Sequence, residues 1–175
     1  MRAPKALTKE RVRKAALFHL QRHASTRVSL RRVLTRRVNR VLRVHEGDRD
    51  EMLQWVEDAL DYCERLGYLD DARFATHKAR ALRRRGASTR KIRAKLAEKG
   101  VASSLVDQAL EDEDGASELR SALRLVRRRR FGAWATGETD RRRELAALAR
   151  AGFSYDLAKK ALQMSLEDAE AVLAG

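Results

Sequence analysis

The sequence predicts an all-α protein of three tandem three-helix repeats that form an elongated, curved helical array. The chain of 175 residues contains one proline and only 5% aromatic residues. Its core must therefore consist mostly of Leu, Val and Ala, which suits packed helices better than sheets. Apolar residues recur at helical spacing, and segments 62 and 52 residues apart share caps, apolar positions and glycines.

The predicted first repeat covers residues 1–66 and begins with a loose, basic stretch over residues 1–6. Apolar residues spaced along one helix face predict helices over about 8–22, 27–43 and 51–66. Seven arginines and no acid surround the apolar face of the second of these helices. A long polar loop over residues 44–50 precedes the third helix, whose outer face is acidic.

The predicted central repeat covers residues 67–113, with helices over about 71–85 and 88–99 and a third beginning at Ser103 or Ser104. Its second helix places Ile92 and Leu96 inward. The inward stripe expected for its first helix consists of Phe74, His77, Lys78, Ala81 and Leu82.

The predicted third repeat covers residues 116–166 and follows an acidic linker at 112–115. Helices are expected over about 116–130, from Thr139 or Asp140 to 151, and from Ser154 through Leu162. Residues 167–175 form a tail or a short helix, with Ser165 and Asp168 placed to cap each other.

Capping residues and glycines mark the expected helix ends. Thr8, Asp50, Asp70 and Ser88 are predicted N-caps, because their side-chain oxygens accept hydrogen bonds from first-turn N–H groups. Glycine adopts the left-handed conformation that ends many helices. The glycines expected to end helices in this way are Gly67, Gly86, Gly100 and Gly152.

The charge pattern points to a polyanionic partner. The net charge is +14, and residues 76–100 contain ten Lys or Arg and one acid, whereas residues 101–118 contain six acids and no base. Each repeat is basic on its first two helices and acidic, or only weakly charged, on its third. Clustered cations release condensed counterions from a phosphate backbone, which favours nucleic acid, alone or within a nucleoprotein complex. The alternative is that these bases only form solvated helix faces.

The predicted partner surface is centred on the turn at Gly86. Some of its cations have an alternative role as partners of the acids at 111–114, and exposed pairs of that kind contribute at most about 1 kcal/mol. The predicted contact residues are Arg83, Arg84, Arg85, Arg90, Lys91, Arg93, Lys95, Arg127, Arg128, Arg129, Arg130, Arg141, Arg142 and Arg143.

No catalytic or cofactor-binding constellation is recognised, so we expect neither an enzyme nor a cofactor requirement. His19 and His23 are four residues apart on one helix, but the sequence offers no evident third metal ligand, and no metal site is predicted. The single cysteine, Cys63, is expected to be a buried apolar residue. No membrane span or signal peptide is recognised, which favours a cytoplasmic protein.

One segment also fits a different function, that of a helix-turn-helix transcription regulator. The stretch LAEKGVASSLVDQAL (96–110) has the spacing of that motif, with Gly100 in the turn. A recognition helix must enter the major groove. The second helix here carries Asp107, Glu111 and Asp112 and no base, so phosphates would repel it. We keep sequence-specific DNA binding as the alternative.

Three stretches together resemble the RecX family of regulatory proteins. They are GYLDDARFA (67–75), RRRGASTRKIRAKLAEKGV (83–101) and RAGFSYDLAKKAL (150–162). The match is good from about Val56 to Leu162 and looser in the first repeat. The second helix of that repeat is longer and richer in arginine than the family pattern, and a polar insertion precedes its third helix.

The resemblance implies a non-enzymatic, cytoplasmic regulator of homologous recombination, DNA repair and the SOS response. Its implied partner is the RecA filament on single-stranded DNA, with weak direct binding to DNA. It would lie as a monomer along the filament groove and modulate RecA, chiefly by inhibiting its recombinase, ATPase and coprotease activities.

Overall fold

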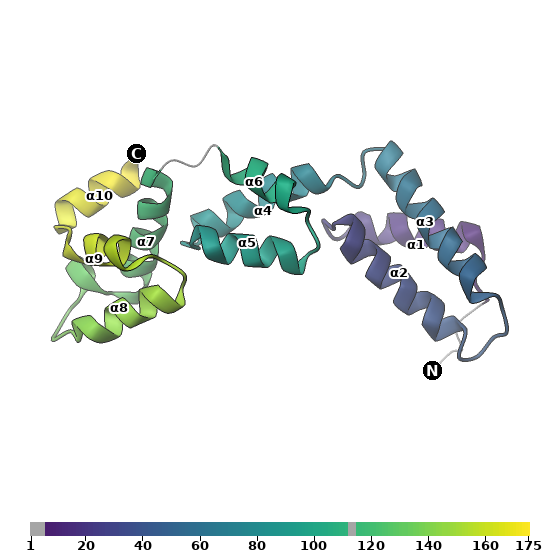
Figure 1. The fold of residues 1–175 in the computed structure, drawn as a ribbon, viewed down its shortest axis with the longest axis horizontal. Coiled ribbons are helices and arrows are strands. Elements are labelled where there is room, and N and C mark those ends of the chain that lie inside the picture. The colour runs from purple at the N-terminus through teal and green to yellow at the C-terminus, as the bar shows by residue number, and fades with distance from the viewer. Residues whose placement is uncertain (1–5, 112–114) are drawn as a thin grey trace. The chain divides into compact units, whose positions relative to one another are not determined.

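The computed structural model describes residues 6–111 and 115–175. Within these residues the chain forms ten α-helices and one short 3₁₀ helix, and it contains no strand (Figure 1). The all-α prediction is therefore confirmed. The acids at 112–114 of the expected linker lie outside the described residues.

The chain divides by its contacts into two units. The first contains the described residues up to Phe74 together with Lys99–Val101, and the second contains Ala75–Glu98 and the described residues from Ala102 onward. The helix α4 (Asp71–Arg84) begins in the first unit and continues in the second.

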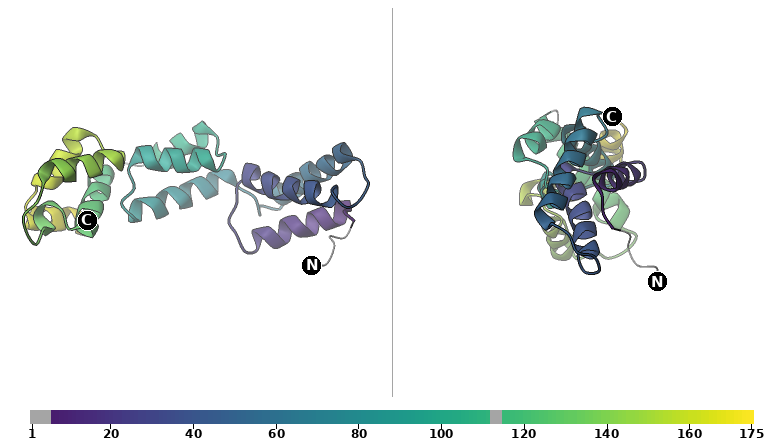
Figure 2. Two further views of the ribbon diagram at one scale, coloured as in Figure 1. Left: turned by 90° about the horizontal axis from the view of Figure 1, so that it is seen from below. Right: turned by 90° about the vertical axis from the view of Figure 1, so that its right-hand side faces the viewer.

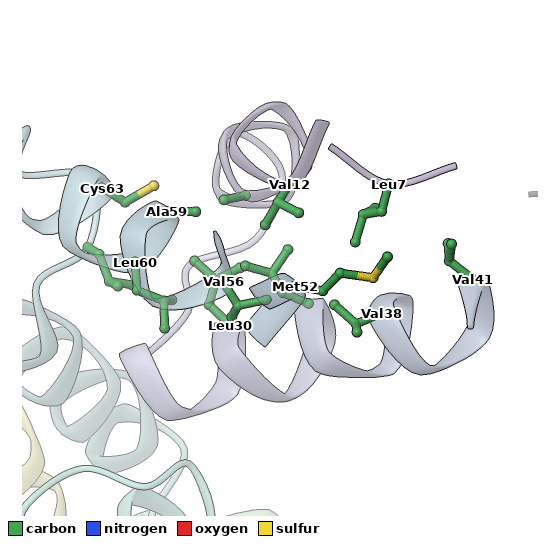
Figure 3. Packing of buried hydrophobic residues seen from close by; sticks show 13 residues of the cluster. Leu7, Val12, Leu30, Val38, Val41, Met52, Val56, Ala59, Leu60 and Cys63 are labelled. Carbon is green, nitrogen blue, oxygen red and sulfur yellow. The ribbon is translucent and has the colours of Figure 1, made fainter. Parts of the chain in front are cut away.

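The first unit is built around α1 (Lys9–Leu20), α2 (Arg27–Val41) and α3 (Arg49–Arg65), which lie side by side in Figures 1 and 2. Apolar side chains from all three helices meet in one cluster (Figure 3). Cys63 is fully buried in this cluster, as predicted, and burial raises the pKa of its thiol. The largest fully buried side chains of the first unit are Val12, Leu30, Leu34, Val38, Val56 and Leu60, together with Thr26.

Two boundary predictions for α3 were wrong. Asp48, not Asp50, caps the helix, because its Oδ1 accepts hydrogen bonds from the backbone N–H groups of Asp50 at 2.8 Å and Glu51 at 3.2 Å. The polar loop is correspondingly shorter. Leu66, expected to face inward, is 51% exposed because α3 ends one residue earlier and the chain turns at Gly67.

The second unit contains the rest of α4 and the remaining helices. α5 covers Thr89–Glu98 and α6 covers Ser103–Glu111. The others are α7 (Gly115–Arg129), the 3₁₀ helix η1 (Gly132–Trp134), α8 (Arg141–Arg150), α9 (Tyr155–Gln163) and α10 (Leu166–Ala174).

The last four α-helices share one apolar cluster. Leu123, Val126 and Leu148 are its most deeply buried large side chains, and α10 adds Ala169 to it. The possible short C-terminal helix is therefore present and packs against α7. Ser165 caps it by accepting a hydrogen bond from the Asp168 N–H at 3.1 Å, and the Ser165 hydroxyl donates to the Asp168 carboxylate at 2.7 Å.

The inward stripe predicted for α4 was displaced by about one residue. The buried residues of this helix are Ala75, Ala79 and Arg83, whereas His77 is exposed. The other members of the predicted stripe, Phe74, Lys78, Ala81 and Leu82, are half-buried. The packed face therefore follows small alanines, which permit close approach of neighbouring segments, rather than the largest side chains.

The N-cap hydroxyls of α2 and α5 make equivalent contacts with distant turns. Thr26 donates a hydrogen bond to the Lys99 carbonyl at 2.5 Å within the first unit. Ser88, 62 positions later, donates to the Ala151 carbonyl at 2.7 Å within the second unit. Both hydroxyl residues are fully buried.

A glycine follows each of these acceptor carbonyls, and no other residue fits there. Gly100 and Gly152 have φ values of +76° and +95°, which L side chains rarely adopt. A Cβ at Gly152 would lie 2.5 Å from the Ser88 Oγ, and one at Gly100 would lie 2.5 Å from the Cβ of Val28. The predicted terminal glycines thus also allow a close tertiary approach.

A carboxylate from the second helix further along the chain, α4 for α2 and α7 for α5, completes each contact. Asp71 Oδ1 accepts a hydrogen bond from the Arg27 N–H at 2.8 Å, and Glu118 Oε1 accepts one from the Thr89 N–H at 3.1 Å. In the second unit, these contacts hold the starts of α5 and α7 and the end of α8 together.

Candidate anionic-partner interface

A basic groove lies where the α4–α5 turn meets the C-terminal half of α7 and the end of α8. It has a volume of about 360 Å³, and all of its ionisable lining residues are cations. We call it the basic groove, and its cations are Arg85, Lys91, Arg128, Arg129 and Arg150. None of the five forms an ion pair with a carboxylate in the described part of the chain.

Backbone contacts fix the position of this groove. Arg128 donates a hydrogen bond from Nη1 to the Arg85 carbonyl at 2.7 Å, which fastens the end of α7 to the α4–α5 turn. Gly86 permits the close approach, because a Cβ there would lie 2.9 Å from the Ser121 carbonyl oxygen. The groove is therefore part of the packed structure of the second unit.

Four of the predicted contact residues line this groove, and they come from two predicted repeats. Arg85 and Lys91 belong to the central repeat, whereas Arg128 and Arg129 belong to the third. Sequence reasoning missed Arg150. The 52-residue correspondence that relates the two repeats places it on Glu98, so an arginine at the position of an acid was a usable signal.

Arg83 departs from the prediction, because its side chain is only 7% exposed. It pairs with Glu118 and donates hydrogen bonds to the Ala87 carbonyl at 3.0 Å and to Thr89 Oγ1 at 2.5 Å. Glu118 Oε1 in turn accepts the hydrogen bond from the Thr89 N–H. Arg83 thus helps to hold α4, α5 and α7 together and is not available to a partner.

The other predicted cations of the central repeat are exposed at the surface. Arg84 lines another hollow, of about 410 Å³, and Arg90 is exposed. Arg93 pairs with Asp107 at 2.5 Å and Lys95 pairs with Glu98 at 2.8 Å, but each keeps about half of its side chain exposed.

The remaining predicted cations of the third repeat do not line the basic groove. Arg127 and Arg130 are exposed at the end of α7. Arg141 is half-buried and lies 3.5 Å from Glu144, whereas Arg142 is exposed. Arg143 pairs with Asp140 at 3.1 Å and remains 88% exposed.

The alternative pairing with the acids at 111–114 falls largely outside the described residues, which include only Glu111 of the four. Among the predicted contact cations of the central repeat, the ion pairs that the structure describes instead join Arg83 to Glu118, Arg93 to Asp107 and Lys95 to Glu98. Asp107 lies on α6, the helix that would have to enter a DNA major groove in a helix-turn-helix protein.

The described side chains form no metal-binding cluster, and the described helices include no candidate membrane span. Over residues 6–111 and 115–175, no group of three or more His, Cys, Asp or Glu side chains is placed to hold a metal ion. The rings of His19 and His23 lie 5.1 Å apart without a third ligand group. None of the described helices combines the length and the apolar character needed to cross a bilayer.

The chain is similar to several curated proteins named "Regulatory protein RecX". That of Myxococcus xanthus is 41% identical over 164 residues, which are 91% of this chain and 88% of the relative. That of Halorhodospira halophila is 34% identical and the match covers 92% of each chain. That of Agrobacterium fabrum is 30% identical, covering 92% of this chain and 86% of the relative.

A family model and solved structures agree with these relatives. The model described as "RecX, second three-helix domain" matches residues 70–110. The crystal structure of RecX from Lactobacillus salivarius superposes with a TM-score of 0.66 at 19% identity, covering 89% of this chain and 94% of that one. This likeness shows a shared fold. Identities of 30–41% over nearly the full length of the chain show that it belongs to the RecX family of regulatory proteins.

Proposed function

We propose that this protein regulates homologous recombination and DNA repair by binding the RecA filament on single-stranded DNA and inhibiting RecA. The observation that carries the proposal is the basic groove, which gathers five cations without an acidic partner among the described residues. A cluster of uncompensated guanidinium and ammonium groups binds polyanions well, because binding releases counterions. Membership in a family of regulatory proteins supports this reading.

In this proposal the protein acts by occupying a surface rather than by catalysis. It binds as a monomer in the cytoplasm, where it contacts phosphates of the filament strand or acidic patches of RecA, and it binds naked DNA more weakly. Arg93 and Lys95 are each paired with an acid and remain about half exposed. In this proposal they contribute to partner binding less than the cations of the basic groove do. Inhibition then follows because the bound protein obstructs strand exchange, ATP turnover and coprotease activity.

The test replaces three groove cations together, as Lys91→Gln, Arg129→Gln and Arg150→Gln. These side chains are exposed, so helicity and melting temperature should stay close to those of the wild type. The concentration needed to inhibit RecA strand exchange and ATP hydrolysis should rise several-fold. A matched control removes the same charge outside the groove, as Arg49→Gln, Lys159→Gln and Lys160→Gln, and should inhibit like the wild type. Equal inhibition by both triple variants would refute the groove as the contact.

The helix-turn-helix alternative makes the opposite prediction. Replacing Ser104, Asp107 and Gln108 on α6 should hardly affect filament binding if the basic groove is the contact. If instead these replacements governed DNA affinity and a preferred duplex sequence emerged, the protein would be a transcription regulator.

A further inference from the structure

A separate basic hollow lies in the first unit, between the end of α1 and the outer face of α2. Its volume is about 490 Å³, and no acid lines it. The residues that matter here are Phe18, Arg22, His23, Arg36, Arg37 and Arg40, and we call this hollow the α1–α2 groove. Sequence analysis left the arginine excess of α2 without a specific role.

Five of the six arginines of α2 fall into two groups. Near the start of the helix, Arg27 pairs with Asp61 at 2.8 Å and Glu64 at 2.6 Å on α3, and Arg31 pairs with Glu57 at 2.6 Å. The positive charges of Arg27 and Arg31 are therefore compensated by carboxylates of α3.

The three groove arginines of α2 lack such partners. Arg36, Arg37 and Arg40 have no carboxylate within ion-pair distance anywhere in the described chain. Their positive charges repel one another, and nothing described in the fold neutralises them. An anion bound in the groove would remove that repulsion, so their concentration on one wall points to an anionic ligand.

The opposite wall offers a flat, apolar surface. Phe18 is 54% exposed, and the Arg22 guanidinium carbon lies 3.8 Å from the centroid of its ring. The guanidinium lies over the ring, and both side chains are exposed to solvent. Such a pair is a platform for a nucleobase, because bases stack on both aromatic rings and guanidinium planes.

Two histidines stand beside this platform. Burial, and secondarily the neighbouring His23, hold the pKa of His19 below its usual value, so its imidazole is neutral at pH 7. A neutral imidazole still has one N–H to donate, and it adds no repulsion to the cations of the groove.

We propose that the α1–α2 groove binds single-stranded nucleic acid directly, with its phosphates on Arg36, Arg37 and Arg40 and one unpaired base stacked on the Phe18–Arg22 pair. An acidic peptide would use the cations and leave the ring unused, and the bases of a duplex are not free to stack on it. The inference does not rest on the proposed function, because binding is measured without RecA.

The first arm of the test separates the phosphate contacts. The full-length protein binds a labelled twelve-nucleotide oligothymidylate over a salt series, as wild type and as Arg36→Gln, Arg37→Gln, Arg40→Gln. Loss of three phosphate contacts should lower the slope of log affinity against log salt by about 2. The control variant Lys14→Gln, Arg49→Gln, Arg65→Gln removes the same charge elsewhere in the first unit and should keep a slope close to that of the wild type. Equal slopes in all three proteins would overturn the proposal.

The second arm tests stacking. Phe18→Leu keeps apolar volume but loses the ring, and it should weaken binding about tenfold without changing the salt slope. Phe18→Tyr should restore binding. A 5-iodouracil oligonucleotide should crosslink to Phe18 on irradiation. Wild-type affinity in Phe18→Leu, or crosslinks confined to the second unit, would contradict the stacked base.

The third arm compares competitors. Unlabelled oligothymidylate should displace the probe, whereas polyglutamate and a duplex of equal length should displace it poorly. Polyglutamate competing as well as the oligonucleotide would assign the groove to an acidic peptide and overturn the proposal. Thymidine monophosphate competing equally per nucleotide would reduce the groove to a free-nucleotide site and overturn the assignment to a strand.

Discussion

Adjacent arginines at the end of α4 have opposite roles. Arg83 is buried and bonded to Glu118, Thr89 and the Ala87 carbonyl, whereas Arg84 is exposed. Sequence reasoning placed both in the partner surface because it treated the run of three arginines as one feature. The i, i+4 spacing of Ala75, Ala79 and Arg83 was the signal that separates them, since it puts Arg83 on the packed face.

Substitution of these two residues should give contrasting results. Arg83→Ala leaves the Glu118 carboxylate, which is 23% exposed, without its cation, and it should lower the free energy of unfolding by about 2–4 kcal/mol. Arg84→Ala should change it by less than about 0.5 kcal/mol. Urea denaturation followed by circular dichroism measures both. Equal stability of the two variants would show that the buried pair does not support the fold.

His19 should make stability depend on pH in mildly acidic solution. Because burial and His23 keep its pKa low in the folded protein, the unfolded chain takes up a proton there first as the pH falls. The contribution of His19 is complete above about pH 6.5 and declines below it. His19→Gln should therefore lose less melting temperature between pH 7.5 and 5.5 than the wild type does. An identical loss in both proteins would count against this assignment.

At the scale of the helix, the sequence located caps well because capping is local chemistry. Thr8 and Ser154 accept the first-turn N–H groups as expected, and Asp70 does so for Arg73 at 2.8 Å. The Thr26–Lys99 and Ser88–Ala151 hydrogen bonds could not be predicted in the same way, because each joins residues more than 60 positions apart. The basic groove depends on such tertiary contacts. The sequence therefore identified four of its cations but did not predict that they line one groove.

The Ser88 contact should be important for the second unit. Ser88→Ala removes both the cap of α5 and the hydrogen bond to the Ala151 carbonyl, and it should cost about 1–3 kcal/mol of unfolding free energy. Ser154→Ala removes an exposed cap alone, at α9, and should cost about 1 kcal/mol. Thermal unfolding of the two variants gives the comparison. A larger loss for Ser154→Ala would contradict the role of the buried contact.

α7 ends at an arginine in the left-handed region. Arg130 has a φ of +54°, at the place where other helices of this chain carry a glycine. That conformation costs a side chain about 1 kcal/mol, so Arg130→Gly should stabilise the protein by about 0.5–1 kcal/mol. Arg130→Ala, which loses the same charge and keeps a Cβ, serves as the control and should bring no gain. Equal melting temperatures for these two variants would argue against backbone strain.

At the scale of the whole molecule, the all-α class and the RecX resemblance were both confirmed. Periodicity and helix breakers determine secondary structure locally, and the family model matches residues 70–110, which include most of the GYLDDARFA stretch. The division into repeats at 1–66, 67–113 and 116–166 stays a prediction. The equivalent hydrogen bonds of Thr26 and Ser88 support it. The contacts within the chain nevertheless divide it into two units, and the first unit includes the start of α4 and Lys99–Val101, which the prediction assigned to the central repeat.

The purified protein should have no catalytic activity of its own. It should not hydrolyse ATP, because no catalytic constellation is recognised in its sequence. Addition of a chelator to a magnesium-replete assay should leave its effect on RecA unchanged, since the described residues form no cluster that could hold a metal. ATP turnover by the protein alone, or loss of its effect with the chelator, would contradict a purely binding role.

The most direct test of the central claim is co-sedimentation with RecA filaments over a salt series, compared with naked single-stranded and duplex DNA. The wild type should sediment with filaments at salt concentrations that release it from both naked DNAs. The variant Lys91→Gln, Arg129→Gln, Arg150→Gln should bind filaments several-fold more weakly and with a shallower salt dependence. Equal binding to filament and naked DNA, or an unchanged groove variant, would contradict regulation of RecA through this surface.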